Sequence, residues 1–144
     1  MSQHLVVLLL GSNLGNIQNN IDDALAFIEA EIGGIFKKSE YLLSAPVEYE
    51  SSNIFCNIAV KITTSLSPTK LLQQLKKIER KMGRNEDSFI LGRYSDRIID
   101  IDIVMYDNLS FSSENLKLPH IKHINERDFS KKIISQLDNK IRSI

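Results

Sequence analysis

The sequence predicts an α+β fold in which an antiparallel sheet carries helices on one face. Three observations predict it: short apolar runs rich in β-branched residues, longer segments with apolar residues at helical spacing, and their order along the chain, β-α-β-β-α-β. The chain has 144 residues, of which 42% are hydrophobic and 25% charged. This length and composition are typical of one globular domain, so we expect residues 1–144 to form a single domain.

The first half of this core should contain a strand, a helix and a second strand. Residues 5–10 are six consecutive apolar residues, which predict a buried strand. The glycine- and asparagine-rich residues 11–16 follow as a tight strand-to-helix turn, and residues 35–43 predict the next strand. The helix between them should end near Gly33. Its apolar side chains at helical spacing are Ile17, Ile21, Leu25 and Ile28.

The second half should contain a long strand, a helix and a final strand. Residues 54–64 alternate as a strand does, and residues 98–106 form a second β-branched run. Ser67 and Pro68 suit the N-cap and first position of a helix that Gly83 ends. The expected inward-facing side chains are Ile54, Cys56, Ile58, Val60 and Ile62 on the strand and Leu71, Leu72, Leu75, Ile78 and Met82 on the helix.

A C-terminal appendix should follow the core. Residues 109–111 and 116–118 are short strand candidates, and residues 127–137 predict a last helix. The connector at residues 84–96 has no clear period and is long, which is common for functional loops. The βαββαβ order is that of the ferredoxin-like arrangement, with both core helices on one face of the sheet.

The charge balance and the cysteine content exclude some classes of partner. Lys+Arg and Asp+Glu number 18 each, and the pI is near 6.8, which argues against nucleic acid or an anionic membrane as the main partner. The single cysteine, Cys56, cannot form an internal disulfide and reads as a small core residue. The apolar run near the N-terminus is too short to span a bilayer. The cysteine content therefore favours a cytoplasmic protein. We also expect a monomer with small-molecule partners.

Two aspartates in the last core strand are the strongest chemical signal. Asp100 and Asp102 are two residues apart in a strand, so their carboxylates point to the same face. Two like charges side by side repel, and a bound cation relieves this; ligands that are all oxygen favour Mg²⁺. Arg97 is placed to meet substrate phosphates. The alternative is an exposed strand edge with two solvated acids, but the flanking isoleucines favour a buried strand.

Five short motifs occur in order along the chain: Gly11-Ser-Asn-Leu-Gly15, Phe55-Cys-Asn57, Glu79 with Gly83-Arg84, Arg97 with Asp100-Ile-Asp102, and Leu118-Pro-His120 with Arg127-Asp-Phe129. Together they resemble the 6-hydroxymethyl-7,8-dihydropterin pyrophosphokinase family. Its members transfer a pyrophosphoryl group from ATP to the pterin hydroxymethyl oxygen in folate biosynthesis and leave AMP. The resemblance extends from about residue 5 to residue 130 and implies a ferredoxin-like fold, in agreement with the order of the predicted elements.

The resemblance implies a nucleotide site with two Mg²⁺ ions and ATP as co-substrate. Asp100 and Asp102 match the metal ligands, and Arg84 and Arg97 match the arginines that grip the triphosphate. His120 and Arg127 match a second set of phosphate contacts. The residues implied to contact the rest of the nucleotide are Leu72, Lys76, Glu79, Tyr94 and Ile103. A surface ion pair is an equally good interpretation of Lys76 and Glu79, which lie three apart on one helix face.

A pterin site is implied as well. Phe55 and Phe129 match a pair of aromatic side chains that stack on the pterin, although an ordinary core position would also explain Phe55. Asn57 shares a strand face with Phe55, and its amide both donates and accepts hydrogen bonds, as a pterin edge requires. The loop of Ser44, Pro46 and Val47 matches the segment that supplies further edge contacts.

The chain departs from the family pattern in several places, of which two concern site residues. Tyr94-Ser-Asp-Arg97 stands where many members have Trp-Gly-Pro-Arg, and one extra residue separates His120 from Arg127. Three other functions remain open. The chain could be a phosphotransferase that acts on a different acceptor, an RNA-binding module of the same fold, or a pterin binder without catalysis.

Overall fold

The computed structural model describes residues 3–44, 54–83 and 98–138. The core elements follow the expected order, except that two short strands stand where one was predicted. They are β1 (His4–Ser12), α1 (Ile17–Glu31), β2 (Ile35–Lys38), β3 (Leu42–Ser44), β4 (Phe55–Thr64), α2 (Pro68–Lys81) and β5 (Asp100–Tyr106). The appendix contains β6 (Phe111–Ser112), β7 (Lys117–Leu118), the π-helical turn η1 (Lys122–Glu126) and α3 (Asp128–Gln136).

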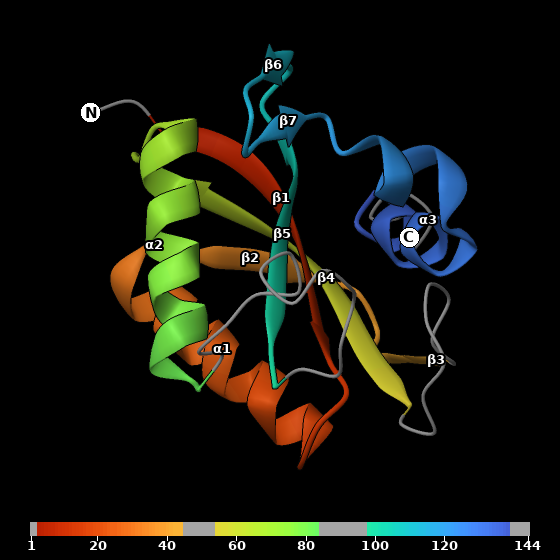
Figure 1. Cartoon of the computed structure of the whole chain (residues 1–144). Helices are drawn as coiled ribbons and strands as arrows, with labels where there is room; N and C mark the ends of the chain where they lie inside the picture. Colours follow the sequence, from red (N-terminus) through yellow and green to blue (C-terminus); the bar gives the residue numbers. More distant parts are fainter. Residues whose placement is uncertain (1–2, 45–53, 84–97, 139–144) are drawn as a thin grey trace.

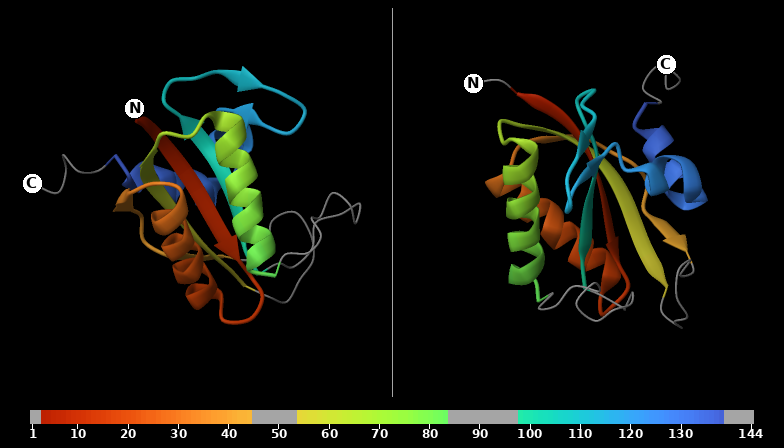
Figure 2. Two further views of the ribbon diagram at one scale, coloured as in Figure 1. Left: turned by 90° about the vertical axis from the view of Figure 1, so that its left-hand side faces the viewer. Right: turned by 45° about the horizontal axis from the view of Figure 1, so that its top comes forward.

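The main sheet has the strand order β2-β4-β1-β5, and β3 extends the same edge of β4. Every pairing in it is antiparallel. This order and these directions are those of the ferredoxin-like arrangement, as predicted. Helices α1 and α2 cover one face of the sheet, and α3 lies against the other (Figures 1 and 2).

Both faces of the sheet bury apolar side chains. The larger cluster, here called the main core, lies between the sheet and helices α1 and α2, and it includes Cys56. The smaller cluster, here called the α3 core, packs α3 on the opposite face. Its buried members are Val7, Leu9, Ala59, Val104, Ile133 and Leu137.

Most of the predicted inward-facing residues are confirmed in the main core, but Ile54 is a correction. Its side chain is 55% exposed, and it precedes β4. The described ladder between β3 and β4 ends at the pair of Ser44 and Phe55, and none of the described strands pairs with Ile54. Helix α3 matches its predicted bounds to within one residue at each end.

The turn at residues 11–16 has a structural role, as predicted. The Asn20 amide donates from Nδ2 to Ser12 Oγ at 3.2 Å and to the Leu14 carbonyl at 2.8 Å. The Asn16 side chain caps α1 by accepting from the Asn19 N–H at 3.2 Å. Gly15 has a φ of 73°, which favours glycine.

Ser39 divides the predicted strand at residues 35–43 into β2 and β3. Its backbone N–H donates to the Ala59 carbonyl at 2.8 Å, and its hydroxyl oxygen accepts from the Ala59 N–H at 2.9 Å. A side chain therefore takes the place of one ladder carbonyl. Lys38 is opposite Val60 and Leu42 is opposite Asn57, so this edge carries one extra residue, as in a β-bulge.

None of the helices in the described ranges has both the length and the apolar character needed to cross a membrane.

Candidate active site

The two aspartates of β5 lie on one face of the sheet, as predicted. The isoleucines that alternate with them are buried in the main core: Ile99, Ile101 and Ile103 are 0%, 2% and 3% exposed. Asp100 and Asp102 are half-buried and point to the opposite face, which α3 covers in part. The alternative of two fully solvated acids is therefore wrong.

Among the described strands, β5 is at the edge of the main sheet, and its outer backbone groups form hydrogen bonds with other segments of the chain. The Glu79 carboxylate accepts from the Ile101 N–H at 2.7 Å, and the His120 N–H donates to the Val104 carbonyl at 2.9 Å. These bonds satisfy backbone groups that an edge strand would otherwise expose. They also fix the aspartate-bearing strand between α2 and the segment after β7.

Glu79 forms the ion pair with Lys76 that its spacing suggests, but its own carboxylate is buried. Its side chain is 3% exposed, and Lys76 Nζ lies 3.6 Å from its Oε1 atom. The carboxylate therefore links α2 to the main-chain atoms of β5 directly behind the two aspartates. Its contact with a nucleotide stays a prediction.

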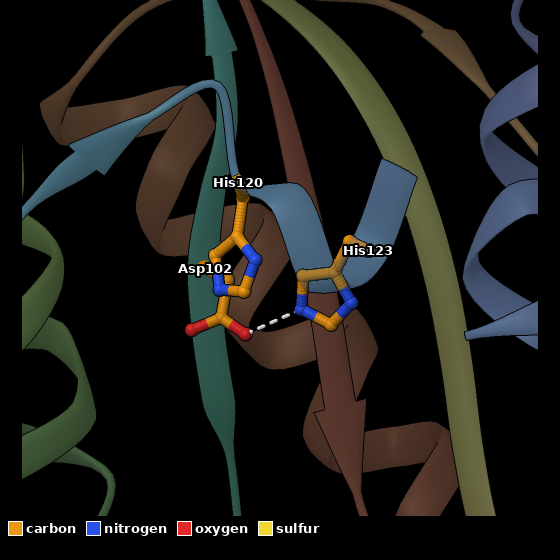
Figure 3. Close-up of side chains that lie close together, drawn as sticks. All are labelled: Asp102, His120 and His123. Atoms are coloured by element: carbon orange, nitrogen blue, oxygen red, sulfur yellow. Dashed lines mark hydrogen bonds and ion pairs between the residues drawn. The ribbon is translucent and has the colours of Figure 1, made fainter. Parts of the chain in front are cut away.

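Asp102 is held by the buried side chain of His123 (Figure 3), which in turn contacts the buried Ser130. His123 Nε2 lies 2.7 Å from Asp102 Oδ2, and His123 Nδ1 lies 2.7 Å from Ser130 Oγ on α3. Burial alone would raise the pKa of Asp102. The hydrogen bond and charge of His123, with His120 and Lys76 beyond it, outweigh burial and hold the pKa below its usual value. Asp102 is therefore an ionised carboxylate at neutral pH.

His120 lies beside the same carboxylate. Its ring centroid is 4.2 Å from that of His123, with 32° between the ring planes. Burial lowers the pKa of His120, with smaller effects from His123 and Arg127, while Asp102 opposes them. The imidazole is therefore neutral near pH 7. Its Nδ1 atom is buried and has no hydrogen-bond partner within the described part of the chain.

The segment between His120 and Arg127, where the family resemblance implies one extra residue, contains the π-helical turn η1. A π-turn contains about one residue more than an α-turn. Arg127 follows η1 directly as the N-cap of α3, and Phe129 in the first turn of α3 packs against the α3 core. His123 belongs to η1, and its ring meets the Phe129 ring edge-on at 6.4 Å.

The residues predicted to bind the pterin, as far as the structure describes them, share the face that carries the aspartates. Asn57 on β4 is opposite Gly11 on β1, and Gly11 is opposite Asp100 on β5. Two strand spacings separate Asn57 from Asp100, or about 10 Å between their backbones. A Cβ atom on Gly11 would lie 2.6 Å from Asn57 Oδ1 and 3.8 Å from a Phe55 ring carbon. The missing side chain of Gly11 thus leaves room for Asn57.

We expect Gly11→Ala to weaken pterin binding through Asn57, because the added methyl group would displace the Asn57 amide. A pterin titration by fluorescence quenching should show an affinity loss of about tenfold, the effect of one neutral hydrogen bond. The matched variant Asn57→Ala should lose a similar amount. The double variant should be no weaker than Asn57→Ala alone. Additive losses would contradict this role of Gly11.

The other predicted site residues are on both sides of β5 or outside the described ranges. On the face of the aspartates are Phe55, Asn57, His120 and Phe129; Ser44 pairs with Phe55 in the sheet, and Arg127 caps α3. On the helical face are Leu72, Lys76, Glu79 and Ile103, with Leu72 and Ile103 in or against the main core. Outside the described residues are Pro46, Val47, Arg84, Tyr94 and Arg97.

Sequence reasoning assigned no role to His123 or Ser130. Both are buried, at 2% and 0% exposure. A weak signal for Ser130 was present: it shares the buried side of α3 with Ile133 and Leu137, and a polar residue in an apolar stripe needs a partner. No periodic pattern marks His123, because it lies in a π-turn.

The aspartates fit the Mg²⁺ ions that the family resemblance implies. Mg²⁺ binds through one or two carboxylates together with phosphate oxygens and water. Asp100 and Asp102 supply two carboxylates on one face, and neither is fully buried. The donor set is thus suited to Mg²⁺ that arrives with a nucleotide.

This chain is similar to known proteins over most of its length. Residues 7–139 match the family model of 7,8-dihydro-6-hydroxymethylpterin-pyrophosphokinase (HPPK). A 2-amino-4-hydroxy-6-hydroxymethyldihydropteridine pyrophosphokinase of Porphyromonas gingivalis is 34% identical over 92% of this chain and 90% of its own length. The mitochondrial folate synthesis bifunctional protein of Arabidopsis thaliana is 40% identical over 89% of this chain, which spans only 22% of that protein's length.

A solved structure supports the fold. The wild-type HPPK-DHPS of Plasmodium falciparum, crystallised with pterin and p-hydroxybenzoate, is similar with a TM-score of 0.63 and 20% sequence identity. The match covers 93% of this chain and 32% of that one. Because the family model matches most of the chain and the bacterial relative is similar over nearly its full length, this chain belongs to the 7,8-dihydro-6-hydroxymethylpterin-pyrophosphokinase family.

Proposed function

We propose that this chain is an ATP-dependent diphosphokinase of tetrahydrofolate biosynthesis. It transfers a pyrophosphoryl group from ATP to 6-hydroxymethyl-7,8-dihydropterin and gives AMP and the pterin diphosphate. The observation that carries the proposal is the row of Asn57, Gly11 and Asp100 across three strands. The Asn57 amide, which would bind the pterin, and the aspartate carboxylates, which would bind the metal, therefore share one face, with about 10 Å between the backbones of Asn57 and Asp100.

The reaction is a displacement at the β-phosphorus of ATP. The hydroxymethyl oxygen of the pterin attacks this phosphorus and loses its proton, and the bond to the oxygen that bridges the α- and β-phosphates breaks. Asp100 and Asp102 would hold two Mg²⁺ ions, which neutralise phosphate charge when bound. The protein itself mainly positions the two substrates.

Side chains on the same face would bind the pterin. Phe55 and Phe129 supply aromatic surfaces for stacking on its ring, and the Asn57 amide donates to and accepts from its edge. Ser44, beside Phe55 in the sheet, would begin the loop of further edge contacts that continues through Pro46 and Val47.

The nucleotide would extend around the edge strand β5. Its phosphates would lie near the aspartates and contact Arg84, Arg97, His120 and Arg127. The remaining contacts proposed for the nucleotide are Leu72, Lys76, Glu79, Tyr94 and Ile103. This placement of the nucleotide is supported by the two segments that carry these residues. Helix α2 and the segment after β7 both form hydrogen bonds with β5.

We expect His120→Ala to slow transfer by about 10²-fold, the effect of one lost contact to developing charge. Its backbone bond to Val104 places the imidazole next to Asp102, whereas the Asn57 side of the site is two strands away. Pterin affinity, measured by fluorescence titration beside the steady-state rate, should therefore change little. A defect confined to pterin binding would contradict a phosphate role.

The proposed function is tested by product analysis. The purified chain is incubated with ATP, Mg²⁺ and reduced 6-hydroxymethylpterin, and the products are separated by chromatography. Pterin-dependent AMP and a pterin diphosphate are the expected products. ADP would instead indicate a simple phosphotransferase, and pterin binding without turnover would indicate a binding protein without catalysis.

The domain organisation, the oligomeric state, the location and the class of partner also belong to the proposal. Residues 1–144 would act as a single pyrophosphokinase domain, a monomer in the cytoplasm, with neither nucleic acid nor a membrane as its partner. The free thiol of Cys56, buried in the main core, supports a reducing environment.

A further inference from the structure

Asp102, His120 and His123 together form a donor set that differs from a magnesium site. Each offers one ligand atom, and these atoms all lie within 4.8 Å of one another. Asp102 comes from β5, whereas the histidines come from the segment after β7, and both rings face the Asp102 carboxylate (Figure 3). Two imidazoles and one carboxylate suit Zn²⁺ or Co²⁺, whereas Mg²⁺ prefers ligands that are all oxygen.

A hydrogen bond orients His123 for metal binding. Its Nδ1 atom lies 2.7 Å from the hydroxyl of the fully buried Ser130. When an ion displaces the proton from Nε2, the ring proton is on Nδ1 and is donated to Ser130 Oγ, and the Nε2 lone pair faces the ion. This is the arrangement by which an outer hydrogen-bond partner fixes the tautomer and ring orientation of a metal-binding histidine. An ion would replace the proton that His123 Nε2 and Asp102 Oδ2 share across 2.7 Å.

His120 adds a second imidazole whose position is also fixed. Its backbone N–H bond to Val104 and its ring contact with His123 hold it beside the carboxylate. Its buried Nδ1 atom makes no hydrogen bond with the described residues, and a bound ion is one of the few things that explain such an atom.

We propose that Asp102, His120 and His123 bind a first-row transition-metal dication of the Zn²⁺ and Co²⁺ class when no nucleotide is present. The consequence for catalysis rests on the proposed function. An ion held by the histidines occupies the Asp102 carboxylate, which Mg²⁺-ATP also needs, so Zn²⁺ should inhibit transfer and excess Mg²⁺-ATP should relieve the inhibition.

The test is a Co²⁺ titration of the nucleotide-free chain, followed by visible absorption. High-spin Co²⁺ with imidazole ligands in a site of low coordination number absorbs far more strongly than hydrated Co²⁺. We expect saturation at one equivalent, and loss of the signal or at least about tenfold weaker binding in His123→Ala. His120→Ala should show the same effect. Because His120 is less buried than His123, this variant tests the site even if His123→Ala fails to fold.

His4→Ala is the matched control. His4 also contacts an aspartate, with Nδ1 2.7 Å from Asp107 Oδ2, but it lies at the other end of β5 and belongs to no such cluster among the described residues. It should retain the wild-type Co²⁺ spectrum. Absence of the spectrum in the wild type, or a Co²⁺ affinity equal to that of the wild type in both His123→Ala and His120→Ala, would overturn the metal site. The spectrum needs no turnover, so a failure of the proposed function would be seen separately in the product assay.

Discussion

Asp102→Asn is expected to reduce pyrophosphoryl transfer by at least about 10³-fold, because charge stabilisation by bound metal contributes several kcal/mol to such reactions. The asparagine keeps the shape of the side chain and still accepts a hydrogen bond from His123, so the fold should be retained. Pterin affinity should also be retained, because Asn57 lies two strands away. The rate of AMP release measures the transfer, pterin titration measures the affinity, and circular dichroism measures whether the fold is retained.

Asp107→Asn is the matched control for this variant. Asp107 also contacts a histidine at 2.7 Å, but it follows β5 at the surface. Its φ of 50° is one that asparagine tolerates. It should transfer at the wild-type rate. If Asp102→Asn also turned over within a few-fold of the wild type, the assignment of Asp102 as a metal ligand would be wrong.

Gly33→Ala is expected to lower the free energy of unfolding by about 3 kcal/mol or more, because the new methyl group would meet backbone atoms that have no room to move. A Cβ atom on Gly33 would lie 1.8 Å from the Thr63 carbonyl oxygen. The hydrogen bonds of Thr64 Oγ1 to the Ile32 carbonyl and of the Thr63 N–H to the Gly34 carbonyl clamp this segment to β4. Denaturant unfolding measures the change.

Gly34→Ala is the control, one residue further along. A Cβ atom on Gly34 would have nothing within 4 Å, so this variant should change the free energy of unfolding by less than about 1 kcal/mol. If the two variants had equal free energies of unfolding, the predicted clash between the added methyl group of Gly33→Ala and the backbone of β4 would be wrong.

The regular part of the fold could be predicted from the sequence because periodicity determines it. The spacing of two between Asp100 and Asp102, with isoleucines between them, was enough to place both carboxylates on one face and the isoleucines in the main core. The order of strands and helices was enough to predict the ferredoxin-like arrangement.

The parts that could not be predicted depend on single side chains that replace backbone partners or on non-periodic turns. The hydroxyl of Ser39 enters the ladder with Ala59 and splits one predicted strand into β2 and β3. The π-turn brings His123 to Asp102 and to Ser130 on α3. Neither feature repeats along the chain, so only the tertiary contacts reveal them.

The distance between metal and pterin tests the site most directly. Mn²⁺, which accepts the same oxygen ligands as Mg²⁺, is added to the chain with a non-hydrolysable ATP analogue and the pterin, and the NMR relaxation of the pterin protons is measured. The shared face predicts strong paramagnetic relaxation of the bound pterin, consistent with a separation of about 10 Å or less, and its loss in a variant lacking both Asp100 and Asp102 carboxylates. The contradicting result is a bound pterin whose protons relax no faster than those of pterin mixed with Mn²⁺ and the nucleotide in the absence of the protein. It would show that the two substrates do not share a single site.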